Sequence, residues 1–159
     1  MTRLDRDTFG IVLLAKNAHA HALLQAADVK KTYHALVYGG PTEGEGIINA
    51  PIDRRPLPSL LRFVGPEGKP SMTEYQVLER NEMLCKLALR PITGRTHQLR
   101  VHCAHEGFPI LGDPQYGSEA SQAFSGELGL THQMLCAKRL EFVHPITGAQ
   151  MVLESNMDV

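Results

Sequence analysis

Short strand-like runs recur along almost the whole chain, and this recurrence most constrains its fold. Only two segments have helical character: residues 18–26, which follow the potential N-cap Asn17, and residues 96–106, which end at Gly107. Because strands outnumber helices and many follow one another directly, we expect an α+β fold with a mixed, largely antiparallel β-sheet and a few flanking helices. The expected strands cover residues 10–16, 33–38, 47–50, 71–79, 83–89, 134–144 and 150–154.

Two segments between these elements have the composition of loops. Residues 54–69 are rich in proline and glycine, which predicts a loop or an insertion. Residues 118–131 are mostly small and polar, which predicts a surface loop. The expected strands over residues 71–79 and 83–89 are separated by only a short polar stretch, so we expect them to pair as a hairpin.

The size and composition of the chain are those of one ordinary globular domain. It has 159 residues, of which 43% are hydrophobic and 21% are charged. No apolar run approaches the ~20 residues of a membrane span, and the first residues are charged, unlike a secretory signal. The three cysteines, Cys85, Cys103 and Cys136, form no CxxC pair. This pattern predicts reduced thiols in a cytoplasmic protein, with neither a metal site nor a disulfide framework.

The charge of the chain is nearly balanced overall but uneven along the sequence. A net charge of −1 is low for a general nucleic-acid-binding protein, because phosphate binding is dominated by lysine and arginine. Residues 80–105, however, hold five lysine and arginine residues, three histidines and a single acid, Glu82. Such a basic segment inside a neutral chain favours a local site for an anionic ligand.

Residues 3–8, RLDRDT, place two carboxylates among two arginines directly before an expected buried strand. A solvated charged turn accounts for this composition. A catalytic aspartate at the edge of a strand, held ionised by a neighbouring guanidinium, accounts for it as well. The residues alone leave both interpretations open.

Residues 93–100, TGRTHQLR, place Arg95 after a glycine turn and next to the start of an expected helix. A cation there opposes the helix dipole at a cost of about several tenths of a kcal/mol, which suggests an anionic partner, although a side chain that extends into water is the alternative. His97 and His102 are five residues apart and point away from each other, unlike the i, i+4 pair of a zinc site. The other candidate donors, either to an RNA or to the fold, are His97, Gln98 and Arg100.

Four ordered segments between residues 3 and 148 form one pattern of motifs. RLDRDT at residues 3–8 precedes the apolar run at residues 10–16, and KTYHALVYG follows at residues 31–39. Residues 93–117 contain TGRTHQLR and GDPQYG, and residues 136–148 end in HPITG. This set resembles the motifs of the RluA-type RNA pseudouridine synthases. The His-Gln pair favours the RluA group over the related RsuA group.

The resemblance implies an enzyme that isomerises a specific uridine to pseudouridine in structured ribosomal or transfer RNA, without a metal or an organic cofactor. It implies that Asp5 is the catalytic aspartate, that Tyr33 stacks on the target base and that Arg95 pairs with Asp5. Arg3 corresponds to the residue that fills the gap left by the flipped-out uridine. The other residues expected to contact RNA are Lys31, His97, Gln98 and Arg100.

The chain departs from the family pattern in two ways. Thr2 stands where the family usually has a histidine before the Arg-Leu-Asp triplet. Family members also usually have a substantial N-terminal part of the catalytic domain before this motif, often preceded by an S4 RNA-binding domain. We therefore expect residues 1–159 to form a partial catalytic domain without an S4 domain, and we expect a monomer.

Two other functions stay open at this stage. The chain could be a non-catalytic RNA-binding module that kept the fold, or a glycosidase that acts through Asp5 and a second carboxylate such as Asp7. A binding module has no reason to keep an acid that repels phosphate, so the combination of Asp5, Tyr33 and Arg95 favours the enzyme.

The enzyme hypothesis makes two structural predictions. The strands over residues 10–16 and 33–38 should be neighbours that line one cleft, because Asp5 and Tyr33 must reach the same base. Asp5 and Arg95 should form a direct ion pair, which would hold the carboxylate ionised.

Overall fold

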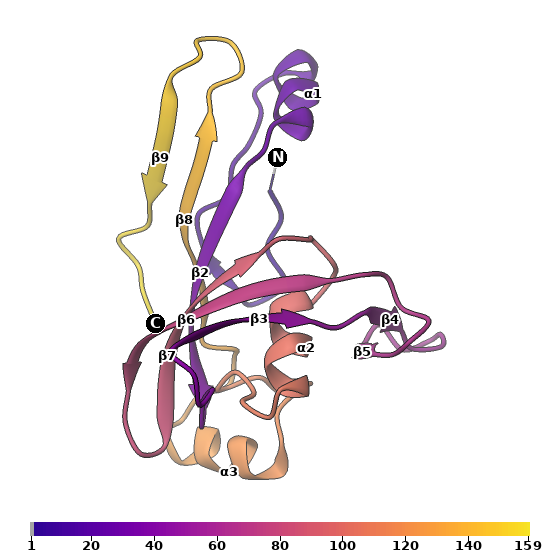
Figure 1. Ribbon diagram of the computed structural model, residues 1–159, viewed down its shortest axis with the longest axis vertical. Helices are drawn as coiled ribbons and strands as arrows, with labels where there is room; N and C mark the ends of the chain where they lie inside the picture. Colours follow the sequence, from indigo (N-terminus) through magenta and orange to yellow (C-terminus); the bar gives the residue numbers. More distant parts are fainter. Residues whose placement is uncertain (1) are drawn as a thin grey trace.

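A seven-stranded sheet forms the centre of the molecule, and the computed structural model describes residues 2–159 of the chain (Figure 1). The strand order is β1-β8-β2-β7-β6-β3, and β9 also pairs with β8. All pairs are antiparallel except β1 with β8, which confirms the predicted α+β class with a largely antiparallel sheet. The strands are β1 (Phe9–Gly10), β2 (Lys30–Tyr38), β3 (Glu45–Asn49), β6 (Met72–Arg80), β7 (Leu84–Pro91), β8 (Leu135–Val143) and β9 (Gln150–Glu154).

The main core lies on one face of this sheet. Side chains of a strand alternate between the two faces, so Ala35 and Val37 of β2 point to one side and His34 points to the other. Ala35 and Val37 are fully buried, and helix α2 (Gln98–His105) adds Leu99 and Cys103 to the same core. Figure 1 shows α2 lying against the central strands, so residues that flank this helix are held close to the sheet.

The helical segments follow their local capping signals. Helix α1 (Ala18–Ala26) has the predicted bounds, and Oδ1 of Asn17 accepts a hydrogen bond from the Ala20 N–H at 2.8 Å. Helix α2 is shorter than the predicted segment of residues 96–106, because His97 takes a left-handed conformation with φ of 57° and the helix begins after it. Within residues 2–159, no helix is long and apolar enough to cross a membrane.

The predicted strand over residues 10–16 is wrong. Strand β1 ends at Gly10, whose φ is 116°, and a Cβ atom at this position would lie 2.3 Å from the backbone oxygen of Ala137. The chain therefore passes β8 at a point where only glycine fits. Since β8 lies between β1 and β2, the two segments predicted to be neighbouring strands are separated by one strand.

The two predicted loops contain regular structure. Strands β4 (Ile52–Arg54) and β5 (Arg62–Val64) form a separate hairpin that projects from the main sheet in Figure 1. Helix α3 (Glu119–Glu127) occupies most of residues 118–131, and Oγ of Ser118 caps it by accepting from the Ser121 N–H at 3.1 Å. The buried Ser125 hydroxyl donates to the Ser121 carbonyl at 2.6 Å, so a polar face packs without unpaired groups. The hairpin predicted from residues 71–79 and 83–89 is confirmed as β6 and β7.

Candidate active site

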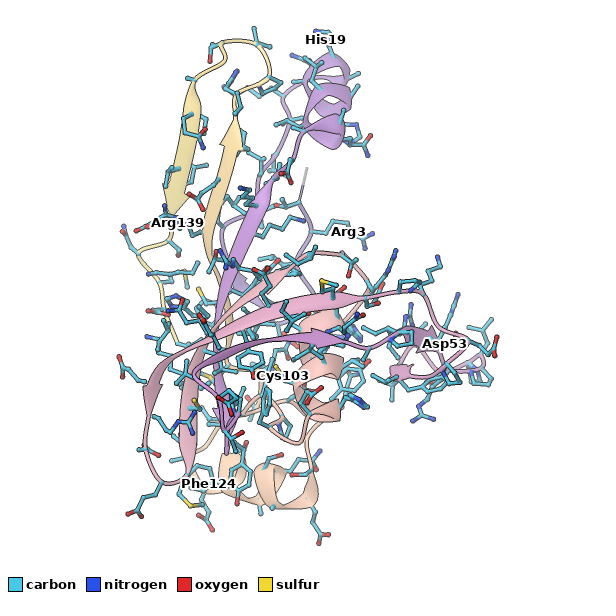
Figure 2. All side chains as sticks on the ribbon, viewed as in Figure 1. Arg3, His19, Asp53, Cys103, Phe124 and Arg139 are labelled. Carbon is cyan, nitrogen blue, oxygen red and sulfur yellow. The ribbon has the colours of Figure 1, made fainter. Side chains whose placement is uncertain are left out.

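A cleft of about 360 Å³ lies where the N-terminal segment, β2 and the loop before α2 meet. Its walls come from segments that are far apart in the sequence, and Figure 2 shows Arg3 on the N-terminal segment extending away from the ribbon. The cleft brings together most of the residues singled out from the sequence. These are Arg3, Asp5, Lys31, Tyr33, Arg95, His97 and Gln98.

The Asp5 side of the cleft is a tight turn anchored from a distant part of the chain. The Thr8 N–H donates to the Asp5 carbonyl at 3.0 Å, and Asp7 has a left-handed φ of 66°. The buried side chain of Gln133 donates through Nε2 to the Arg6 carbonyl at 2.7 Å and to the Thr8 hydroxyl at 3.1 Å. Gln133 therefore holds the turn in place. Its position more than 120 residues later gave no local signal in the sequence.

Tyr33 forms a wall of the cleft on β2. Its side chain is half-buried and packs against the core beneath the sheet. Burial, together with the negative charge of Asp5, raises the pKa of Tyr33 to about 12. The phenol therefore keeps its proton at neutral pH, and its ring faces the same space as the Asp5 carboxylate.

Arg95 lines the cleft but does not form the predicted ion pair with Asp5. Its Nε and Nη2 atoms donate to the Pro70 carbonyl at 3.1 and 3.0 Å, and no ion pair joins Arg95 to Asp5 within residues 2–159. The physical reason lies in the position of α2. The helix begins at Gln98, so Arg95 stands in the preceding loop, where the chain runs past Pro70. Both charges nevertheless face one cleft.

Gln98 is buried and its polar atoms are engaged by the protein itself. Its Oε1 atom accepts from the Thr93 hydroxyl at 2.7 Å and from the Arg95 N–H at 3.1 Å. Its Nε2 atom donates to the Met72 carbonyl at 2.9 Å and to the Thr73 hydroxyl at 3.0 Å. This geometry ties the loop before α2 to β6, which is a structural role rather than that of an available donor to RNA.

Arg100 lies outside the cleft, although its sequence position suggested an RNA contact. The residue is only 3% exposed and binds Asp113 through two parallel hydrogen bonds of 2.8 and 2.9 Å. A third donor reaches Gln115 at 2.8 Å, and the guanidinium carbon lies 4.9 Å from the centre of the Tyr116 ring. Arg100 therefore anchors the loop of residues 113–116 to α2.

His97 connects the cleft to this anchored loop. Its Nδ1 atom lies 2.6 Å from the Tyr116 hydroxyl oxygen, which also accepts the Arg62 N–H at 3.0 Å. Burial lowers the pKa of His97, even though the nearby Asp5 carboxylate acts in the opposite direction. The sequence suggested His97 as a donor but gave no indication that Tyr116 and the β4–β5 hairpin would hold it.

The charge of the cleft suits an anionic ligand. Three cations, Arg3, Lys31 and Arg95, line it together with the single acid Asp5. Asp7 does not line it, because the Asp7 side chain lies 3.8 Å from Arg6 and 3.7 Å from His132. A glycosidase with Asp5 and Asp7 as its carboxylate pair therefore does not fit. No group of three or more potential metal ligands occurs among the described residues.

A second groove of about 340 Å³ adjoins the cleft, and Gly94 and Arg95 line both. The groove runs along the base of the β4–β5 hairpin, whose projecting position is marked by Asp53 in Figure 2. Sequence reasoning missed this groove because residues 54–69 were expected to be a loop. Its cations are Arg54, Arg62, Lys69 and Arg95, with Asp53 as the single acid.

A solved structure with the same arrangement identifies the class of protein. Human RNA Pseudouridylate Synthase Domain Containing 1 superimposes with a TM-score of 0.82 and 30% sequence identity. The match covers 98% of this chain and 67% of that chain. The sheet and its helices therefore form an RNA pseudouridylate synthase fold.

The sequence comparisons agree with the structure. The profile of the RNA pseudouridylate synthase family matches residues 1–105, and the chain belongs to this family. Ribosomal large subunit pseudouridine synthase C of Vibrio parahaemolyticus is 41% identical over 98% of this chain and 50% of its own length. Ribosomal large subunit pseudouridine synthase D of Escherichia coli K12 is 39% identical over 94% of this chain and 49% of its own length. The chain thus spans about half the length of these curated relatives, and the resemblance inferred from the motifs is confirmed.

Proposed function

We propose that this chain, as part of a pseudouridine synthase catalytic domain, isomerises a uridine of ribosomal or transfer RNA to pseudouridine. One observation carries the proposal: Asp5, Tyr33 and Arg95, from three separate segments, line a single cation-rich cleft. The membership of the RNA pseudouridylate synthase family supports it. The names of the relatives favour ribosomal RNA as the substrate. A cytoplasmic location stays a prediction. A monomeric state stays a prediction.

The chemistry requires no cofactor, because all heavy atoms of the uridine are retained. The bond between N1 of uracil and C1′ of ribose breaks, the base turns, and a bond forms between C5 and C1′. The hydrogen on C5 leaves as a proton, and N1 takes up a proton. A carboxylate can assist such a reaction as a covalent nucleophile. We assign this role to Asp5, with the protonated Tyr33 as the aromatic surface on which the base stacks.

The positive cleft and the adjoining groove supply the attraction for the RNA backbone. Arg3, Lys31 and Arg95 lie around Asp5, and the groove beside Arg95 adds the cations of the β4–β5 hairpin. Phosphate contacts of this kind bind without sequence specificity and weaken as salt rises. Arg100 and Gln98 support the site from within the protein.

The test is replacement of Asp5 by asparagine, with pseudouridine formation measured as tritium release. Large-subunit ribosomal RNA transcribed with tritium at C5 of uridine serves as the substrate. We expect Asp5→Asn to lower the rate by about a thousandfold or more, as removal of a nucleophile does. Affinity for the RNA should be unchanged or slightly higher, because a negative charge near phosphates is removed.

Asp7→Asn is the matched control. Asp7 lies in the same turn but outside the cleft, and asparagine tolerates its left-handed conformation. This variant should react at the parent rate. If Asp5→Asn also reacts at the parent rate, Asp5 is not catalytic. If the parent chain binds the RNA but forms no pseudouridine, the chain is the non-catalytic RNA-binding module instead.

A further inference from the structure

His97 occupies an unusual place in the cleft wall. It precedes α2 in a left-handed conformation with φ of 57°, which a residue with a side chain adopts only when its surroundings compensate for the strain. The compensating contact is the 2.6 Å hydrogen bond between Nδ1 and the Tyr116 hydroxyl. The backbone therefore orients the imidazole so that Nδ1 forms a hydrogen bond with Tyr116 while the ring still lines the cleft beside Asp5.

The hydrogen bonds of Tyr116 determine which nitrogen of His97 carries the proton. The Tyr116 oxygen accepts the Arg62 N–H at 3.0 Å, so its own hydrogen needs an acceptor. Among the described residues, its other hydrogen-bond partner is Nδ1 of His97. The phenol keeps its proton, because burial raises its pKa. Tyr116 therefore donates to Nδ1, and the proton of a neutral His97 resides on Nε2.

The surrounding charges agree with a neutral imidazole. Burial, followed by Arg100 and Arg62, opposes the imidazolium, whereas Asp5 and Asp113 favour it, and the net effect is a lowered pKa for His97. A positive His97 would compete for the Asp5 carboxylate. A neutral His97 leaves that carboxylate available to the substrate.

We propose that His97 is a substrate-binding residue, with its tautomer set by Tyr116, and that its Nε2–H donates to a carbonyl oxygen of the uracil ring held beside Asp5. This inference rests on the proposed function and specifies how the cleft recognises its base. A neutral N–H suits a neutral carbonyl acceptor, whereas a phosphate would favour an imidazolium. The three cations that line the cleft are better suited than a neutral imidazole to bind phosphates.

The tautomer is measured first, on the 159-residue chain without RNA. Nitrogen-15 spectra that correlate ring nitrogens with ring protons separate the two tautomers of each of the eight histidines, and His97→Asn identifies the His97 signals. At pH 7 we expect an unprotonated Nδ1 and a protonated Nε2. In Tyr116→Phe the donor to Nδ1 is lost, so the two tautomers should mix and the imidazole should titrate at higher pH. A protonated Nδ1 or an imidazolium at pH 7 in the parent chain would overturn the proposal.

Two substitutions then separate the two nitrogens. His97→Asn keeps a polar group near Nδ1 and tolerates the left-handed backbone, but it does not reach the cleft. His97→Gln places an amide nitrogen near the position of Nε2. With tritiated ribosomal RNA as substrate, we expect kcat to fall by about tenfold to a hundredfold in His97→Asn, the effect of losing one hydrogen bond to the reacting base. His97→Gln should stay within about tenfold of the parent and lose the acid limb of the pH profile that protonation of His97 produces.

The binding measurements distinguish a base contact from a phosphate contact. RNA affinity of His97→Asn, measured over a range of salt concentrations, should keep the salt dependence of the parent. A shallower dependence would mean that His97 binds a phosphate, and an unchanged kcat in His97→Asn would mean that it binds no part of the reacting base. If the parent chain forms no pseudouridine, the proposed function fails. The His97 proposal is still tested in that case, because an Nε2–H signal unaffected by addition of the ribosomal RNA contradicts it.

Discussion

The cations on the two faces of the central sheet differ in whether they form ion pairs with acids. On the face opposite α2, Lys86 lies 3.0 Å from Asp158, and Arg90 lies 3.0 Å from Glu74. At the cleft, Arg3, Lys31 and Arg95 have no carboxylate within ion-pair distance among residues 2–159. Arg139 on β8, which Figure 2 labels, likewise forms ion pairs with Glu141 and Glu154. A cation is therefore available to an anionic ligand only where the fold leaves it without an acid.

This contrast changes the interpretation of the basic segment over residues 80–105. The sequence predicted one local anion site from five cations. The structure places them in different surroundings. Lys86 and Arg90 are paired with surface acids, Arg80 donates to the Pro41 carbonyl, and Arg100 is paired with Asp113 in the interior. Arg95 is the member of the segment that lines the cleft. A count of basic residues therefore suggests a larger anion-binding surface than the structure provides, because the cations that are paired with acids are not available to an anion.

The interior pair gives the largest expected effect on stability. Replacing Asp113 by alanine leaves the buried Arg100 without its partner, and breaking such a pair costs about 3–5 kcal/mol in the free energy of unfolding. Urea denaturation of Asp113→Ala against the parent measures the loss. Glu74→Ala is the control, because its pair with Arg90 is exposed and should contribute less than about 1 kcal/mol. If both variants lose the same free energy of unfolding, the interior pair stabilises the fold no more than the surface pair does.

The cleft and the opposite face should differ in RNA binding. Lys31→Ala removes a cation from the cleft. The slope of log affinity for RNA against log salt concentration should therefore become shallower by about one unit, the value for one phosphate contact. Lys86→Ala removes a cation that Asp158 already neutralises, so affinity and salt dependence should stay at the parent values. Filter binding of ribosomal RNA at several salt concentrations checks both. A larger loss for Lys86→Ala would place the RNA on the other face.

The smallest expected effect concerns His102, a fully buried histidine of α2. Nε2 of His102 lies 2.9 Å from the Ala50 carbonyl, Nδ1 lies 2.8 Å from the Thr73 hydroxyl, and burial lowers the pKa of His102 below its ordinary value of 6.5. In the unfolded chain His102 binds a proton more readily, so its contribution to stability is present above pH 6.5 and is lost as the pH falls below it. The free energy of unfolding should therefore decrease from pH 7.5 to pH 5.5.

Two variants isolate this contribution. His102→Gln should show a weaker pH dependence of the free energy of unfolding than the parent over that interval. His19→Gln, at the exposed end of α1 that Figure 2 labels, should keep the parent dependence. Parallel curves for the parent and His102→Gln would show that His102 is not the group that titrates.

Elements that depend on neighbouring residues were predictable from the sequence. Asn17 and the alanine-rich segment after it specify α1 within one stretch of chain, and the pattern of residues 71–89 specifies a hairpin. The family pattern also selected Asp5, Tyr33 and Arg95, and the structure brings all three to one cleft. Helix α3 was not predicted, because its serines form hydrogen bonds with one another and with Gly112. The composition of the segment does not reveal these contacts.

The sequence by itself determined the class of fold, the family and the set of candidate site residues, because capping, alternation and motif spacing are properties of short segments. Only the tertiary structure decided which of these residues face the cleft and which are engaged by the protein. Gln98 and Arg100 turned inward to Thr73 and Asp113, and Arg95 bound Pro70 instead of Asp5. The physical reason is that a hydrogen bond or an ion pair depends on the distance between atoms in space, and the partners here are 13 to 25 residues away along the chain.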